Sequence, residues 1–144
     1  MNIYEIINKI NSDWHVYIPE KNPEILNQSF SQEFPHDYLL FIKNLGEGSY
    51  QFQDFLFSSW CSESVIENNK AYQINKYLGE ELIGIATDGG GICFLLDFRI
   101  KGEARFSSIG LGDLDIDEVI VLASTFTEAL QLMIEKNITL ENIL

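Results

Sequence analysis

The chain has 144 residues, and 46% of them are hydrophobic, which is enough to bury a sizeable core in a single domain spanning residues 1–144. The formal net charge is −13, because 22 acidic residues stand against nine basic ones. A surface this acidic repels phosphate backbones and anionic lipids, which argues against direct binding of nucleic acid or of a membrane and favours a basic protein partner.

Helices are predicted for most of the first 46 residues. Four isoleucines repeat with the spacing of one helix face: Ile3, Ile6, Ile7 and Ile10. A turn is expected at Trp14–Pro19, and Asn22 followed by proline is typical of the start of a short helix that continues to Phe30. A third helix begins at Pro35 and ends at Gly46, where a left-handed backbone costs glycine little.

The middle of the chain is predicted to alternate strand and helix. The aromatic-rich segment Tyr50–Trp60 has the composition of a strand. Ser64 and Glu67 have the spacing of a capping box, which predicts a helix over Glu63–Lys76.

The last third of the chain contains the most apolar strands. Two of them, Leu82–Thr87 and Ile92–Phe98, flank a glycine-rich turn and are expected to pair antiparallel near the centre of the sheet. Further strands are expected at Ala104–Ser108 and Val119–Leu122, before a closing helix whose capping box is Thr125 with Glu128. The order of elements predicts an α+β fold, with a mostly antiparallel mixed sheet of about five or six strands and helices packed on it.

No recognisable catalytic or metal-binding pattern is present. The two cysteines, Cys61 and Cys93, are expected to be buried thiols, and neither stands in a local pattern with His15 or His36. The glycine run at 89–91 leads into a strand and lacks the lysine of a phosphate-binding loop. A calcium loop starting at Asp113 would need glycine at its sixth position and glutamate at its twelfth, and has neither.

Three segments carry a resemblance to a known family. They are Phe34-Pro35 followed by Tyr38, Phe41-Ile42 and Asn44–Gly48; the strand–turn–strand Ile83–Asp97; and Ala123–Leu130. In this order they resemble the SUKH superfamily, also called the Smi/Knr family. The resemblance implies a mixed sheet with helices on its faces, no catalytic residues and no cofactor. The sequence departs from the family pattern at Phe34, at the interrupted Asn-Gly-Gly corner and at Gly91.

The resemblance also implies a protein-binding role. Bacterial relatives are similar to immunity proteins that neutralise polymorphic toxins, many of them nucleases, and fungal relatives are similar to scaffolds that regulate cell-wall (glucan) synthesis. We therefore expect a non-catalytic immunity protein, with a regulatory scaffold as the alternative and a cryptic enzyme as the remote one. Residues 1–11 lack the pattern of a signal peptide and no apolar stretch reaches the ~20 residues that span a bilayer, so a cytoplasmic location is expected.

The candidate binding surface is an acidic segment near the end of the chain. From Phe106 to Glu135 there are six acidic residues and no Lys or Arg; they are Asp113, Asp115, Asp117, Glu118, Glu128 and Glu135. The first four are expected to lie in one loop, where a basic toxin domain could meet them, although such a loop can also serve only solubility. Tyr50 and Trp60 are expected to be exposed nearby and to supply aromatic anchors.

Overall fold

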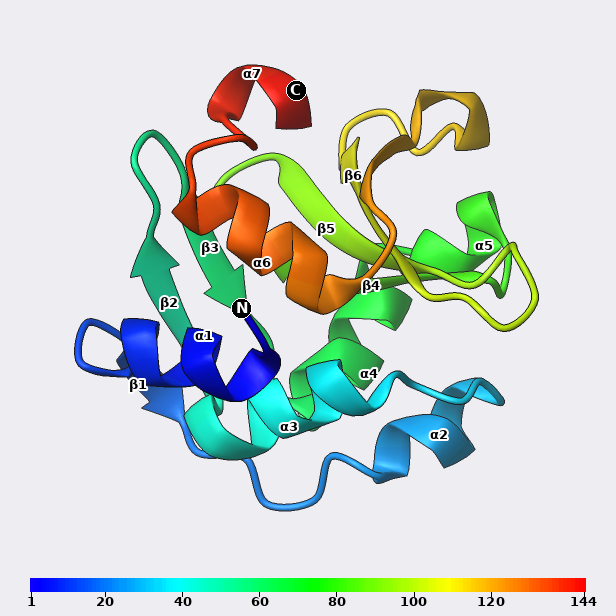
Figure 1. Ribbon diagram of the computed structural model, residues 1–144. Helices are drawn as coiled ribbons and strands as arrows, with labels where there is room; N and C mark the ends of the chain where they lie inside the picture. Colours follow the sequence, from blue (N-terminus) through cyan, green and yellow to red (C-terminus); the bar gives the residue numbers. More distant parts are fainter.

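Seven strands follow one another along the chain and keep that order in one sheet, β1 to β7 (Figure 1). The computed structural model describes residues 1–144. The strands are β1 His15–Ile18, β2 Glu47–Gln51, β3 Leu56–Ser59, β4 Leu82–Thr87, β5 Ile92–Asp97, β6 Arg105–Gly110 and β7 Ile120–Ala123. The helices are α1 Ile3–Asn11, α2 Ile25–Phe30, α3 His36–Leu45, α4 Ser62–Ala71, α5 Ile74–Leu78, α6 Phe126–Ile134 and α7 Leu140–Ile143, with a 3-10 turn η1 at Ile116–Glu118.

The α+β class and the antiparallel character of the sheet are confirmed, but the sheet is not mixed. Every neighbouring pair of strands is antiparallel. The predicted pairing of Leu82–Thr87 with the strand that begins at Ile92 is present, from Leu82 opposite Asp97 to Thr87 opposite Cys93. The turn between these strands uses a positive φ of 81° at Gly89.

The sheet has more strands than expected because two local patterns were misleading. Residues 15–18 form β1, a short edge strand. All four of its residues are exposed, so they do not show the alternation of buried apolar and exposed polar residues by which a strand is usually predicted. The segment Tyr50–Trp60 is a hairpin and not a single strand. Its turn is closed by a bond from the Phe52 N–H to the Phe55 C=O (3.0 Å), without the glycine that usually signals a turn.

Helices α1, α3 and α6 cover one face of the sheet and stand in front of it in Figure 1. An aromatic cluster fills the space between them and the sheet. Phe41 of α3 and Phe126 of α6 meet edge to face with centroids 5.1 Å apart, and Phe94 stacks on Phe106 at 5.5 Å. Because large rings dominate buried apolar area, this cluster is the main source of hydrophobic stabilisation on that face.

Helices α4 and α5 pack against the opposite face, at β4. A side chain at Gly84 would meet Ile74 of α5 and Cys93, whose neighbour Phe94 points to the aromatic cluster on the other side. The single helix expected over Glu63–Lys76 is divided, because Gln73 adopts a left-handed backbone (φ 58°) between α4 and α5. No helix of the structure combines the length and the apolar character needed to cross a membrane.

Close backbone contacts at two glycines hold β1 in place. Gly46 ends α3, as predicted, with φ 70°, and a Cβ there would lie 2.6 Å from the Ile18 carbonyl oxygen. A Cβ at Gly48 would collide with the His15 carbonyl oxygen and lie 2.6 Å from the Trp14 indole nitrogen. The motif glycines therefore let the edge strand approach the end of α3, which is a structural role.

Candidate protein-binding surface

Residues 113–118, the acidic loop, connect β6 to the last strand of the sheet, β7. The loop is built by its own backbone: Glu118 N–H donates to the Asp115 carbonyl at 2.9 Å, and Asp113 N–H donates to the Gly110 carbonyl at 3.1 Å. The Asp115 carboxylate accepts a bond from Asp117 N–H (2.9 Å) and so caps the 3-10 turn η1. One of the four acidic residues thus has a structural task, which an asparagine could also perform.

The four carboxylates of the acidic loop are exposed and have no cationic partner. Asp113, Asp115, Asp117 and Glu118 are all exposed. The only ion pairs in the structure are those that Arg99 and Arg105 make with Asp97. The four negative charges of the acidic loop are therefore not compensated by a cation within the chain, and they repel one another.

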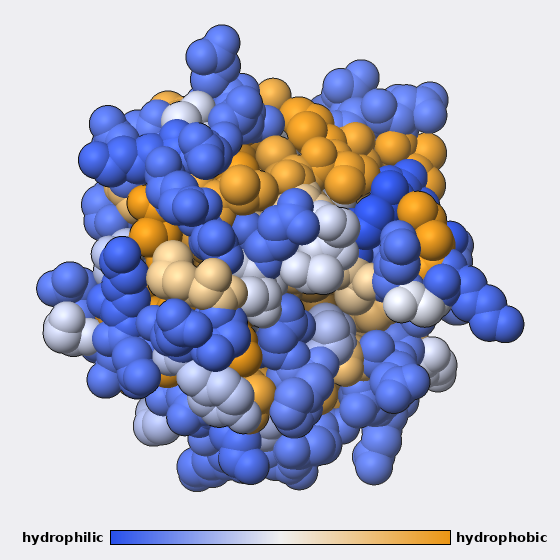
Figure 2. Space-filling view, viewed as in Figure 1, coloured by the Kyte–Doolittle hydropathy of each residue, from blue (hydrophilic) through white to orange (hydrophobic).

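Apolar side chains lie directly beside the acidic loop. We define the apolar strip as the partly or fully exposed hydrophobic residues of this region: Leu111, Leu114, Ile116, Ile120, Val121, Leu122 and Leu144. Ile116 and Val121 keep 43% and 42% of their surface exposed. Figure 2 shows a hydrophobic band over the region where Figure 1 draws the chain from η1 through β7 and the end of α7. A contiguous apolar area with a charged rim is typical of a protein interface.

The two aromatic residues expected beside this loop lie elsewhere. Trp60 is only 7% exposed, and its ring stacks on Tyr72, the residue after α4, with centroids 6.4 Å apart, so the prediction that it is exposed was wrong. Tyr50 is half-buried on β2 and packs edge to face on Phe52 at 4.9 Å. Strands β3, β4 and β5 separate β2 from β6, a distance of about 19 Å at the usual strand spacing.

The cysteines and histidines are dispersed. Both thiols are free and buried, as predicted, and burial raises the pKa of the Cys93 thiol above its usual value. His15 is exposed on β1 and packs against Tyr17, whereas His36 is exposed at the start of α3. Nowhere do three or more His, Cys, Asp or Glu side chains come close enough to hold a metal ion.

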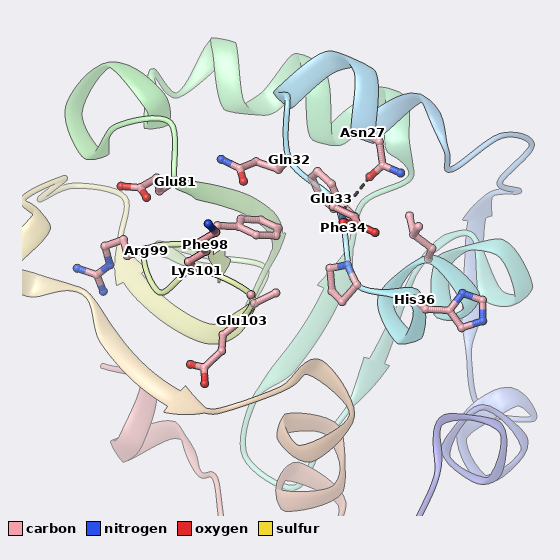
Figure 3. A pocket seen from close by; sticks show the side chains of 14 residues that line it. Asn27, Gln32, Glu33, Phe34, His36, Glu81, Phe98, Arg99, Lys101 and Glu103 are labelled. Carbon is pink, nitrogen blue, oxygen red and sulfur yellow. Dashed lines mark hydrogen bonds between the residues drawn. The ribbon is translucent and has the colours of Figure 1, made fainter.

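A cleft of about 880 Å³ lies between the α2–α3 connection and the β5–β6 turn (Figure 3). Its floor contains Phe34 and Phe98, whose rings meet edge to face at 5.4 Å. Figure 3 shows Lys101 and Glu103 on one side of the cleft, Glu81 beyond them, and the imidazole of His36 pointing away from it. Its rim carries charges of both signs, so it does not attract a ligand of one sign as the acidic loop does.

Asp97 anchors the β5–β6 turn that forms one wall of this cleft. Its carboxylate is fully buried and accepts bonds from Arg99 Nε (2.9 Å), Arg99 Nη2 (2.8 Å) and Arg105 Nη2 (2.7 Å). Burial alone would raise the pKa of Asp97, but the side-chain and backbone bonds from Arg99 and the charges of Arg99 and Arg105 outweigh it and lower the pKa. This cluster is structural, since one buried carboxylate holds the guanidinium groups of Arg99 and Arg105 at the two ends of the turn.

Sequence reasoning located the acidic loop but missed the apolar strip and the cleft. Ile116 and Val121 were visible in the sequence, but their exposure follows from the position of β7 at the edge of the sheet, which only the strand order reveals. The residues that line the cleft come from two segments about 65 residues apart, so no local sequence pattern indicates that they meet.

Comparison with known proteins gives one family. The model of the SMI1 / KNR4 family (SUKH-1) matches residues 6–132, which is most of the chain and includes most of α1, all seven strands and most of α6. No curated protein is significantly similar to the chain.

Proposed function

The chain belongs to the SMI1 / KNR4 family (SUKH-1), and from this we propose that it is a non-catalytic protein-binding module that acts as an immunity protein. Its partner is a toxin domain with a basic surface, such as a nuclease. It would act in the cytoplasm, where a nuclease toxin meets its substrate.

The observation that carries this proposal is the pairing of the acidic loop with the apolar strip. Four exposed carboxylates without cationic partners lie at residues 113–118, and Ile116 and Val121 expose apolar surface in and just after that loop. Interfaces combine an apolar core, which supplies affinity, with a charged rim, which supplies specificity and speed of association.

The chemistry of a nuclease explains why the loop is acidic. An enzyme that binds nucleic acid collects Lys and Arg along the path of the phosphates. The carboxylates of Asp113, Asp117 and Glu118, which make no side-chain bond within the chain, could occupy part of that path. Long-range attraction would also raise the association rate, towards roughly 10⁸–10⁹ M⁻¹s⁻¹ at low salt.

The potential catalytic groups are arranged in a way that favours binding over catalysis. The imidazole of His36 points away from the cleft shown in Figure 3, and the pKa of the Cys93 thiol is raised by burial, which disfavours the nucleophilic thiolate. The acidic excess also argues against direct contact with nucleic acid.

The test first asks whether a toxin gene lies beside this gene, and then measures growth of the native cell, or of a close laboratory host, that expresses that toxin. Co-expression of the chain should restore growth. A variant with Asp113, Asp115 and Asp117 changed to Asn and Glu118 to Gln should restore it less well.

The matched control removes the same number of charges at exposed glutamates outside the loop: Glu24, Glu67, Glu80 and Glu103, each changed to Gln. This variant should protect as well as the natural sequence. If neither the natural chain nor the control protects cells from the neighbouring toxin, the immunity role is wrong, and the scaffold alternative becomes the better one.

A further inference from the structure

The outer edge of β7 has no hydrogen-bonding partner within the chain. β7 is the last strand of the sheet and pairs only with β6, through Phe106–Ala123, Ser107–Val121 and Ser108–Ile120. None of the backbone or side-chain bonds outside the sheet involves its four residues. The N–H and C=O groups that point away from β6 are therefore free to pair with another extended chain.

This edge has no side chain of the kind that prevents such pairing, although β7 is short and its pairing with β6 is irregular between Val121 and Ala123. Exposed edge strands are commonly protected by lysine, proline, an inward-pointing charge or a covering element. β7 reads Ile-Val-Leu-Ala and contains none of these residues. α7 lies over the face of the sheet, because the Ile143 carbonyl accepts a bond from Ser108 Oγ of β6 at 3.2 Å.

We propose that an extended, basic segment of the protein partner adds to β7 as an eighth strand of the sheet. This inference rests on the proposed function, since it describes how the same surface is used. Backbone bonds to β7 would supply the register, and apolar side chains of the added strand would pack on the exposed side chain of Val121.

Charge decides which kind of strand fits. Glu118 lies two residues before Ile120, and Asp117 precedes it, so lysines or arginines of an added strand would meet carboxylates as they approach. A second copy of this chain would bring its own net charge of −13 and its own acidic loop to the contact. Repulsion between the two copies favours a basic partner over self-association.

The opposite edge of the sheet provides an internal control. β1 is also four residues long, reads His-Val-Tyr-Ile without lysine or proline, and exposes about half of Val16. It has no acidic loop of this kind beside it. A strand that binds only through unpaired backbone groups would bind to either edge of the sheet, whereas a basic strand should bind to β7.

The probe is a short, end-capped peptide that alternates lysine with valine, compared with one that alternates glutamate with valine. Binding is followed on the isotope-labelled full chain by amide chemical shifts and by amide hydrogen exchange. The lysine peptide should shift and slow the exchange of amides at 120–123, and the glutamate peptide should do neither.

Two matched variants identify the edge. Val121→Lys places a cation on β7 and should abolish slowed exchange there, whereas Val16→Lys on β1 should leave it unchanged; both sites are exposed, so both variants should fold. The proposal is overturned if millimolar lysine peptide leaves exchange at 120–123 unchanged, if both variants weaken it equally, or if β7 is protected by self-association without peptide. If only residues 113–118 shift, strand addition is wrong while binding through the acidic loop survives.

Discussion

At the scale of single residues, the molecule uses its buried polar groups for structure and leaves them out of reach of a ligand. The Tyr38 hydroxyl is buried and has no hydrogen-bond partner, and burial, with the charge of Glu20 as a smaller cause, raises the pKa of this phenol. Its ring packs edge to face on Phe126 with centroids 5.3 Å apart. The role of this side chain is therefore packing, since an unpaired buried hydroxyl contributes no stabilising bond.

The first prediction concerns that hydroxyl. Tyr38→Phe should keep the free energy of unfolding within about 1 kcal/mol of the natural value or raise it, because it removes an unsatisfied polar atom and keeps the ring. Tyr38→Ala, the control, should cost about 3–5 kcal/mol through the cavity that it leaves. Urea unfolding monitored by circular dichroism measures both. A large loss with Phe would mean that the hydroxyl has a partner after all.

The second prediction concerns Asp97 and pH. Asp97→Asn should lower the free energy of unfolding at pH 7 by about 2–3 kcal/mol, because it weakens charge-assisted bonds from Arg99 and Arg105. The pKa of Asp97 is lowered in the folded state, so its contribution is present above the unfolded pKa of about 3.9 and is lost as pH falls through the folded pKa.

The difference in stability between Asp97→Asn and the natural chain should therefore shrink below about pH 4. Urea unfolding at pH 7 and near pH 3 gives this difference directly. Glu103→Gln, which changes an exposed carboxylate in the same turn, is the control and should change stability little at either pH. A difference that stays constant from pH 7 to pH 3 would contradict the ionised state assigned to Asp97.

At the scale of elements, acidic side chains from distant segments cap several helices. Glu20 accepts bonds from Ser62 N–H (2.7 Å) and Ser62 Oγ (2.8 Å) at the start of α4. Asp37 of α3 accepts from Thr127 N–H (2.9 Å) and Thr127 Oγ1 (2.7 Å) at the start of α6. Carboxylates at helix N-termini satisfy free N–H groups and complement the helix dipole. Part of the acidic excess is therefore structural.

Predictions from the sequence succeeded where local patterns decide the structure and failed where a long-range contact, such as these caps, decides it. Strong local patterns, such as the isoleucines of α1 and the apolar strands β4 and β5, gave the right elements because the pattern and the burial coincide. The box expected at Ser64 and Glu67 was wrong, because α4 begins at Ser62 with Glu20 as the acceptor, 42 residues away. The acidic loop was visible in composition, but the free edge of β7 beside it depends on strand order.

The third prediction separates structural from exposed acids. Asp37→Ala should lower the free energy of unfolding by about 1–2 kcal/mol, because it leaves the Thr127 N–H and hydroxyl in the first turn of α6 without their acceptor. Asp113→Ala, in the acidic loop, should change it by less than about 0.5 kcal/mol, since its side chain makes no bond within the chain. Thermal and urea unfolding of the two variants give the comparison. Equal losses would show that Asp113 also has a structural role.

At the scale of the whole molecule, charge and apolar surface meet at one end of the sheet. The aromatic cluster and two layers of helices make the sheet a rigid platform, and β7 lies at its edge with the acidic loop before it. Exposed charges act over a Debye length of about 8 Å at physiological salt, so in the proposed interface they would mainly set the rate of encounter, while the apolar strip would set the rate of dissociation. We therefore expect different kinetic effects from substitutions of the two kinds of residue.

The central claim, that the acidic loop binds a basic protein, is tested most directly by the association rate with the toxin domain as a function of salt. In stopped-flow measurements, the variant with Asn at 113, 115 and 117 and Gln at 118 should associate about tenfold more slowly at low salt and show a flatter salt dependence. Its dissociation rate should change less, and the variant neutralised at Glu24, Glu67, Glu80 and Glu103 should keep most of the natural rate. An association rate and a salt dependence equal to those of the natural chain, or an equal loss in the control variant, would contradict the claim.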